Sequence, residues 1–269
     1  METQLESQLY RGTIPVLRAW DDPGHDTDPA PSHGFLSREG GVSRGAFASM
    51  NLSYWVGDDR AAVAENWRRF RALVPRDATV ARLNQVHGAV VQRVTRENAR
   101  ARPTADGMVT AEPGIILGIY TADCVPILLL DSRARIAGAI HAGWRGIIAG
   151  IPAAGMCAMV ALGGAPAQIR AALGPSIGLC CFEVDAELAE RFGREVPGSA
   201  LHARPGRPGK AYLDLRAIVR DELVRAGVPV ANVSSVGPCT RCASERFFSR
   251  RAAGGATTGL QMSFIGFDA

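Results

Sequence analysis

Three long apolar segments near the middle of the chain constrain its fold more than any other feature. They span residues 115–121, 125–131 and 136–141 and read IILGIYT, VPILLLD and IAGAIH. Apolar residues follow one another in these segments instead of alternating with polar ones, which is typical of strands that are covered on both faces. We therefore expect mixed sheets that are buried on both sides.

Helical patterns and further strands surround these three segments. The stretch DLRAIVRDELVRA is amphipathic and predicts a helix over 214–226. Asp58 or Asp59 can cap a helix over 61–73, and the small apolar residues of 146–162 predict a buried helix. The remaining elements are predicted as a helix over 185–192 and strands over 89–94, 169–173, 233–236 and 260–264. No repeat or linker interrupts this order, so we expect a single α+β or mixed α/β domain over residues 1–269.

The amino-acid composition limits the kinds of molecule that this protein is expected to bind. Hydrophobic residues make up 47% of the chain and aromatic residues only 6%, so the core must be mostly aliphatic. The formal net charge is +4, with arginine spread along the whole sequence, which does not indicate a nucleic-acid-binding surface. No apolar run is long enough to span a bilayer, and the N-terminus lacks the apolar segment of a secretory signal. We expect a cytoplasmic protein with neither nucleic-acid nor membrane partners.

Three residues that can bind a metal lie in apolar surroundings. They are His87 in NQVHGAVV, Cys124 in TADCVPILLLD and His141 in GAIHAGWRG. Cys124 and His141 each adjoin the end of a predicted strand, where folds of this class place their sites. Two imidazoles and one thiolate suit Zn²⁺, or copper, and three protein ligands leave a fourth position open, as in catalytic zinc sites. The alternative is that the cysteine is an inert buried residue and the histidines are core residues.

Polar residues near these positions could bind a substrate. Asp123 could orient a metal-binding side chain as a neighbouring carboxylate. Arg145, Arg38 and the backbone at Gly40–Gly41 could bind an anion, because guanidinium groups and exposed N–H groups bind phosphate, although each arginine could equally be a solvated surface charge. Two side-chain amides complete the set of substrate candidates, namely those of Asn51 and Gln85.

The other five cysteines carry weaker signals. Cys239 and Cys242 form a CxxC motif, but the sequence shows no second pair nearby, so a turn with two thiols is the simpler interpretation. Cys157 lies on the predicted buried helix and is expected in the core. Cys180 and Cys181 are adjacent, which makes a disulfide bond between them geometrically awkward. Reduced thiols or metal ligands are expected for a cytosolic chain.

The chain resembles the laccase-domain family, also called polyphenol-oxidase-like, which is now associated with purine nucleoside phosphorylase activity. The resemblance covers nearly the whole chain and is carried by HGFLSREGGVSRGAFASMNL, VGDDRAAVAENWRRF, NQVHGAVV, ADGMVT, YTADCVPILLLD, GAIHAGWRG, LGPSIGLCCFEV, YLDLRAIVRDEL and TGLQMSFI. It implies a four-layer α/β/β/α fold and a zinc ion held by His87, Cys124 and His141. It also implies phosphorolysis of adenosine, inosine and S-methyl-5'-thioadenosine, with adenosine deamination as a side activity. Phe182 and Met262 depart from the family pattern, which often has tyrosine and a small residue there.

Three other functions remain open from the residues themselves. A copper-dependent polyphenol oxidase needs several copper ions and many imidazoles, and five histidines are few for that chemistry. A thiol hydrolase or amidase would use Cys124 as its nucleophile and His87 or His141 as its base. A metal-stabilised binding module would not be an enzyme, and the open coordination position is an argument against it.

Overall fold

The computed structural model describes residues 14–20 and 31–268. Two large mixed sheets form its centre. In the six-stranded sheet the order is β13 (Val233–Ser235), β9 (Arg170–Leu173), β7 (Val125–Asp131), β8 (Ile136–Ala142), β5 (Gly107–Thr110) and β4 (Val91–Arg93). In the five-stranded sheet the order is β1 (Val16–Leu17), β2 (Ser32–Leu36), β14 (Gln261–Phe267), β6 (Ile115–Thr121) and β3 (Thr79–Ala81). Parallel and antiparallel pairs occur in both sheets.

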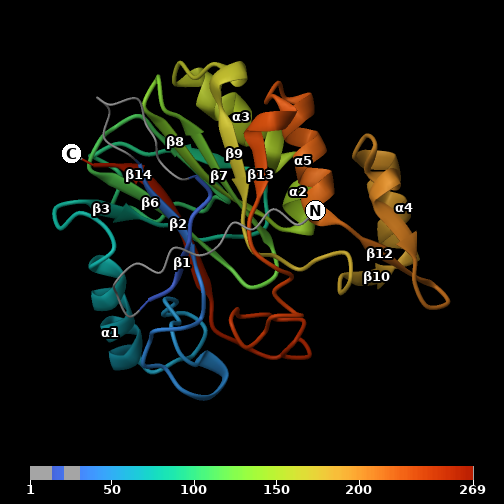
Figure 1. The fold of residues 1–269 in the computed structure, drawn as a ribbon, viewed down its shortest axis with the longest axis horizontal. Helices are drawn as coiled ribbons and strands as arrows, with labels where there is room; N and C mark the ends of the chain where they lie inside the picture. Colours follow the sequence, from blue (N-terminus) through green and yellow to red (C-terminus); the bar gives the residue numbers. More distant parts are fainter. Residues whose placement is uncertain (1–13, 21–30, 269) are drawn as a thin grey trace.

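The two sheets stack face to face and helices cover their outer faces (Figure 1). Helix α1 (Arg60–Arg71) packs on the five-stranded sheet. Helices α2 (Trp144–Ile148), α3 (Ile151–Ala161) and α5 (Leu215–Arg225) pack on the six-stranded sheet. The layers are therefore α/β/β/α, as the family resemblance implies.

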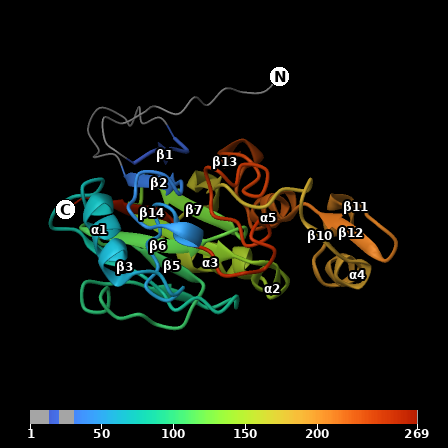
Figure 2. The same ribbon diagram turned by 90° about the horizontal axis from the view of Figure 1, so that it is seen from below.

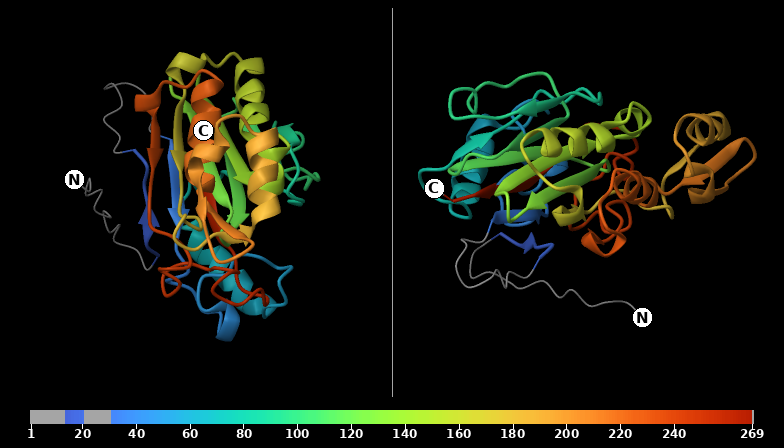
Figure 3. Two further views of the ribbon diagram at one scale, coloured as in Figure 1. Left: turned by 90° about the vertical axis from the view of Figure 1, so that its right-hand side faces the viewer. Right: turned by 90° about the horizontal axis from the view of Figure 1, so that it is seen from above.

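A small third sheet lies at one side of these layers (Figures 2 and 3). Its strand order is β10 (Glu183–Asp185), β12 (Lys210–Leu213) and β11 (Ala203–Pro205), and helix α4 (Ala186–Glu195) packs against it. Short 3-10 helices occur at Gly45–Phe47, Pro166–Gln168, Ser199–His202 and Val230–Asn232. No helix among the described residues is long and apolar enough to cross a membrane.

The three central strands are apolar throughout because each is covered on both faces. In β7, Leu128 and Leu130 face the other sheet, whereas Ile127 and Leu129 face the helices. Alternate side chains of a strand point to opposite faces, so two apolar layers require a continuous apolar run. The ends of β6 and β7 agree with the prediction, and β8 extends one residue further, to Ala142.

The predicted helix over 146–162 is wrong as one element. It consists of α2 and α3, which are separated at Gly150, where the backbone has a φ of 85°. A left-handed residue interrupts a right-handed helix, and glycine adopts this conformation without steric cost. The placement of Cys157 in the core is also wrong, because its side chain is exposed on α3. This helix is apolar nearly all round, so its sequence does not reveal which face is buried.

Candidate active site

The structure brings together the three residues that the sequence predicted as metal ligands. His87 lies between β3 and β4, Cys124 lies between β6 and β7, and His141 lies on β8. The nitrogen and sulfur atoms that they can offer to a metal lie within 4.8 Å of one another. The two imidazole rings are 4.7 Å apart between centroids and nearly perpendicular. His141 is buried, Cys124 is half-buried and His87 is exposed, so the cluster opens toward solvent on the side of His87.

A buried carboxylate that the sequence analysis did not single out holds this cluster together. Asp106 Oδ1 lies 2.8 Å from Nδ1 of His141. The same carboxylate accepts the backbone N–H groups of Val86, His87 and Gly88 at 3.2, 2.8 and 2.7 Å. Burial opposes ionisation, but the bonds from His141 and from these N–H groups outweigh it and lower the pKa of Asp106. The Nε2 atom of His141 is thereby left available to a metal.

The bonds to Asp106 also account for the unusual backbone of His87. Its φ is 61°, in the left-handed region that residues with a side chain rarely adopt. Such a conformation costs roughly 1–3 kcal/mol and persists only where surrounding contacts compensate for it. Three consecutive N–H groups that bind one buried carboxylate provide that compensation.

Gly143 is required by the close packing of the cluster. A Cβ atom at this position would lie 2.6 Å from Cδ2 of His87 and 3.1 Å from Sγ of Cys124. The first distance is shorter than any van der Waals contact, so a side chain here would displace the imidazole. The glycine of the sequence HAGWRG therefore lets the start of α2 approach the cluster.

The charges of Cys124 and His141 stabilise each other. Burial disfavours both charged forms, but the imidazolium of His141 and hydrogen bonds with both histidines lower the pKa of Cys124 to about 6. Burial likewise opposes the charge of His141, but the thiolate and Asp106 raise its pKa to about 9. The cysteine is therefore held as a thiolate at neutral pH, which is the form that binds metals and attacks electrophiles.

The cluster forms part of the wall of a pocket of about 900 Å³. Its size falls in the range of small-molecule sites. Three aromatic and three guanidinium side chains belong to its lining, namely those of Trp55, Tyr120, Trp144, Arg102, Arg145 and Arg250.

The sequence model of one protein family matches most of this chain. The family is described as "Multi-copper polyphenol oxidoreductase laccase", and its model matches residues 32–268. The chain belongs to this family. It is 40% identical over 249 residues to the purine nucleoside phosphorylase YlmD of Geobacillus stearothermophilus, covering 87% of this chain and 89% of that protein. It is 37% identical over 221 residues to the adenosine deaminase RL5 of an unknown prokaryotic organism, covering 78% and 84%.

The fold is that of solved members of this laccase family. The crystal structure of YlmD from Geobacillus stearothermophilus superposes with a TM-score of 0.88 and 34% sequence identity, and 98% of this chain and 99% of that chain are covered. The hypothetical protein YfiH of Bacillus licheniformis superposes with a TM-score of 0.87 and 30% identity, and 97% and 98% are covered.

Two of the five residues predicted to bind a substrate or phosphate line the pocket. Arg145 is exposed on α2, and its guanidinium lies 4.2 Å from the centre of the Trp144 ring. Gln85 also lines the pocket, but its amide is bonded on both sides to the backbone of Tyr120, at 2.8 Å each. Gln85 thus connects the segment that contains His87 to β6 through hydrogen bonds. The side chain of Arg145 is exposed and less constrained.

Arg38 and Asn51 do not belong to this lining. The Arg38 guanidinium binds the carbonyl oxygens of Ala48 and Ser244 and stacks on a phenylalanine ring. Asn51 is fully buried, and its amide binds Ser53, Asp58 and the N–H of Leu260. Both side chains hold loops in place.

The Gly40–Gly41 pair approaches its own chain. A Cβ atom on Gly41 would lie 2.0 Å from the carbonyl oxygen of Ser49. The close approach that the two glycines predict is therefore present, but its partner is the backbone of residues 49 and 50.

Asp123 has different partners from those the sequence suggested. Its carboxylate accepts a hydrogen bond from Thr240 Oγ1 at 2.6 Å and one from the N–H of Arg251 at 2.7 Å. The carboxylate bonded to an imidazole of the cluster is that of Asp106. The only signal for it in the sequence is an acidic residue directly before a buried strand, in the stretch ADGMVT.

Arg102, Arg250 and Trp55 are pocket residues that no sequence pattern indicated. Arg102 lies in a loop, and its guanidinium is 3.4 Å from the centre of the exposed Trp55 ring. Its Nη2 atom donates to the carbonyl of Leu83 at 3.1 Å. Loop residues become neighbours only through the tertiary fold, so spacing along the chain could not identify them.

Proposed function

We propose that this chain is a purine nucleoside phosphorylase that also deaminates adenosine. The observation that carries the proposal is the cluster of His87, Cys124 and His141 in the wall of a pocket lined by aromatic rings and arginines. A similar protein is named a purine nucleoside phosphorylase and another an adenosine deaminase, which supports both activities. The proposed substrates are adenosine, inosine and S-methyl-5'-thioadenosine, together with phosphate.

The chemistry of these ligands fits the pocket. A purine base is flat and apolar on its faces, and the rings of Trp55, Tyr120 and Trp144 offer surfaces against which it can pack. Phosphorolysis also needs an anion beside the ribose. Arg145 is the leading phosphate ligand, because guanidinium groups bind phosphate through paired hydrogen bonds and this one is exposed in the lining.

The cluster fits a single Zn²⁺ ion. Its donors are two imidazoles and a cysteine held as a thiolate, and a carboxylate orients one of the imidazoles. A Zn²⁺ ion bound here would act as a Lewis acid in a site with an open coordination position. Asp106 would keep the proton of His141 on Nδ1, and the bonds to residues 86–88 would hold His87 in place. Cu²⁺ could occupy the same donors.

A thiol hydrolase is the second candidate, because the thiolate of Cys124 and the imidazolium of His141 form the ion pair that such enzymes use. Assays of the purified protein with adenosine, with and without phosphate and before and after chelation, distinguish the two. The phosphorylase releases adenine only when phosphate or arsenate is present, and chelation abolishes activity. Full activity of a metal-free preparation would favour the hydrolase, and adenine release without phosphate would exclude phosphorolysis.

A further inference from the structure

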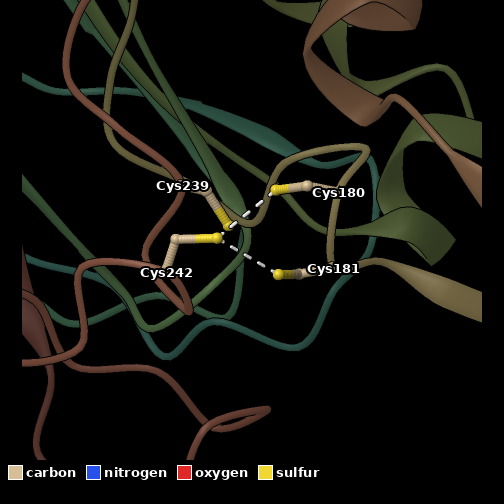
Figure 4. A group of neighbouring side chains, drawn as sticks. All are labelled: Cys180, Cys181, Cys239 and Cys242. Atoms are coloured by element: carbon tan, nitrogen blue, oxygen red, sulfur yellow. Dashed lines mark hydrogen bonds between the residues drawn. The ribbon is translucent and has the colours of Figure 1, made fainter.

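A second cluster of cysteines lies outside the proposed active site. Cys180 and Cys181 lie in the segment between β9 and β10, and Cys239 and Cys242 follow β13. The four sulfur atoms lie within 4.8 Å of one another. Figure 4 shows the four side chains pointing toward a common centre. The CxxC motif, which has no second pair near it in the sequence, therefore has one in space.

The separations of the sulfur atoms suit a shared metal. Cys242 Sγ lies 3.4 Å from Cys181 Sγ and 3.5 Å from Cys180 Sγ. Zinc–sulfur bonds of about 2.3 Å in a tetrahedron place the sulfur atoms about 3.8 Å apart. A disulfide bond is much shorter, at about 2.05 Å. The observed spacing is close to the edge of a tetrahedral site.

Positive charge and N–H donors surround these sulfur atoms. The backbone N–H of Gly178 donates to Cys239 Sγ at 3.2 Å, and Arg241 Nη1 donates to Cys181 Sγ at 3.5 Å. The half-buried guanidinium of Arg216 is close enough to Cys239 to interact electrostatically with it. Four thiolates around a divalent cation carry a net charge of −2, and two guanidinium groups offset that charge.

We propose that Cys180, Cys181, Cys239 and Cys242 form a structural Zn²⁺ site, separate from the proposed active site. Four thiolates complete the tetrahedral coordination of zinc and leave no open position, which is the arrangement of structural sites. The adjacent pair Cys180–Cys181 is an uncommon spacing, and the turn at Gly178 that precedes it brings both sulfur atoms to the same side.

The site fastens two loops that both contact Asp123. Thr240, inside the CxxC motif, donates to the Asp123 carboxylate, and the N–H of Ile177 donates to the Asp123 carbonyl at 2.8 Å. Asp123 has a φ of 94° and directly precedes Cys124. The chain that follows the motif supplies Arg250 to the pocket wall. Zinc at the cysteine cluster therefore braces the backbone that positions Cys124.

The test separates this zinc from any metal at the active site by using a Cys124→Ala background. Cys124→Ala protein, purified without chelator and dialysed, is expected to retain about one zinc per chain. Cys124→Ala with Cys242→Ser is expected to lose that zinc, whereas Cys124→Ala with Cys157→Ala is expected to keep it. Cys242 and Cys157 are both exposed, so neither substitution disturbs the core.

Two further readouts do not depend on activity. Cobalt-substituted Cys124→Ala protein is expected to show the intense thiolate-to-cobalt absorption and the visible bands of a tetrahedral site, and Cys242→Ser is expected to remove them. In zinc-loaded Cys124→Ala protein, a thiol reagent is expected to modify only Cys157, and after chelation it is expected to modify all five cysteines of this variant. A zinc-free Cys124→Ala protein, or a disulfide among the four cysteines found by mass spectrometry, would overturn the proposal.

Discussion

Asp106 and His141 form a hydrogen bond of 2.8 Å between a fully buried carboxylate and a buried imidazole. The same carboxylate accepts the N–H of His87, so one side chain positions two of the three proposed metal ligands. The third, Cys124, is positioned through the neighbouring Asp123. The chemistry proposed for this site therefore depends on two carboxylates that need not touch the substrate.

Asp106→Asn is expected to weaken zinc binding and to lower kcat/KM by about 10- to 100-fold, which is typical when the partner of a metal-binding histidine is changed. The amide keeps the shape of the carboxylate but removes the charge that stabilises the Nδ1 proton of His141. Competition with a coloured chelator measures the zinc Kd, and circular dichroism checks the fold. Asp77→Asn, on an exposed turn, is the matched control. An unchanged zinc Kd would contradict the positioning role of Asp106.

Gly143→Ala is expected to lose zinc at the active site and most of the activity while remaining folded. The added methyl group would lie 2.6 Å from the imidazole of His87, which is on the exposed side of the cluster and can move away. Gly193→Ala is the control, because its methyl group would meet only Ala200, at an ordinary 3.7 Å. Normal zinc content in Gly143→Ala would show that the imidazole is not confined as the structure indicates.

Cys124→Ser and Cys124→Ala are both expected to lose the active-site metal and the activity, whereas the melting temperature falls only modestly. A metal at the edge of a large core contributes little to holding the whole domain together. Cys157→Ala, on the exposed face of α3, is expected to keep full activity. Elemental analysis, thermal unfolding and adenosine turnover measure the three effects. Normal turnover of Cys124→Ala would remove this residue from the mechanism.

The sequence predicts the buried strands and the grouping of three candidate metal ligands well because both are expressed in local patterns. Burial on both faces makes β6, β7 and β8 apolar at nearly every position, and the family motifs contain His87, Cys124 and His141. The contacts of side chains with distant loops leave no such pattern. Asp106 is close to His141 only because β5 pairs with β8, and the two cysteine pairs meet across about 60 residues of chain.

The interruption of the predicted helix over 146–162 illustrates the same limit in local structure. Gly150 lies in an apolar helical pattern, where glycine is unfavourable but tolerated. Whether such a glycine continues the helix or adopts a positive φ depends on how the following segment packs. Here α3 turns back against β8, with which it has many contacts, and that packing decides the outcome.

Arg145→Ala is expected to raise the KM for phosphate and to slow adenine release more than it slows deamination. The loss of one charge-assisted contact is worth about 1.5–3 kcal/mol, or roughly 10- to 150-fold. Deamination uses water and needs no anion site, so inosine formation in the absence of phosphate is expected to be largely spared. Parallel assays of base release and deamination over a range of phosphate concentrations measure both effects.

The same assay ranks the three arginines of the pocket. Arg102→Ala is expected to impair both reactions, because this side chain supports Trp55 and binds the backbone of the adjoining loop. Arg191→Ala, on the exposed face of α4, is the control and is expected to change neither reaction. An equal loss of both activities in Arg145→Ala would mean that Arg145 shapes the pocket in general. A larger rise in the phosphate KM for Arg250→Ala than for Arg145→Ala would transfer the phosphate site to the loop that follows β13.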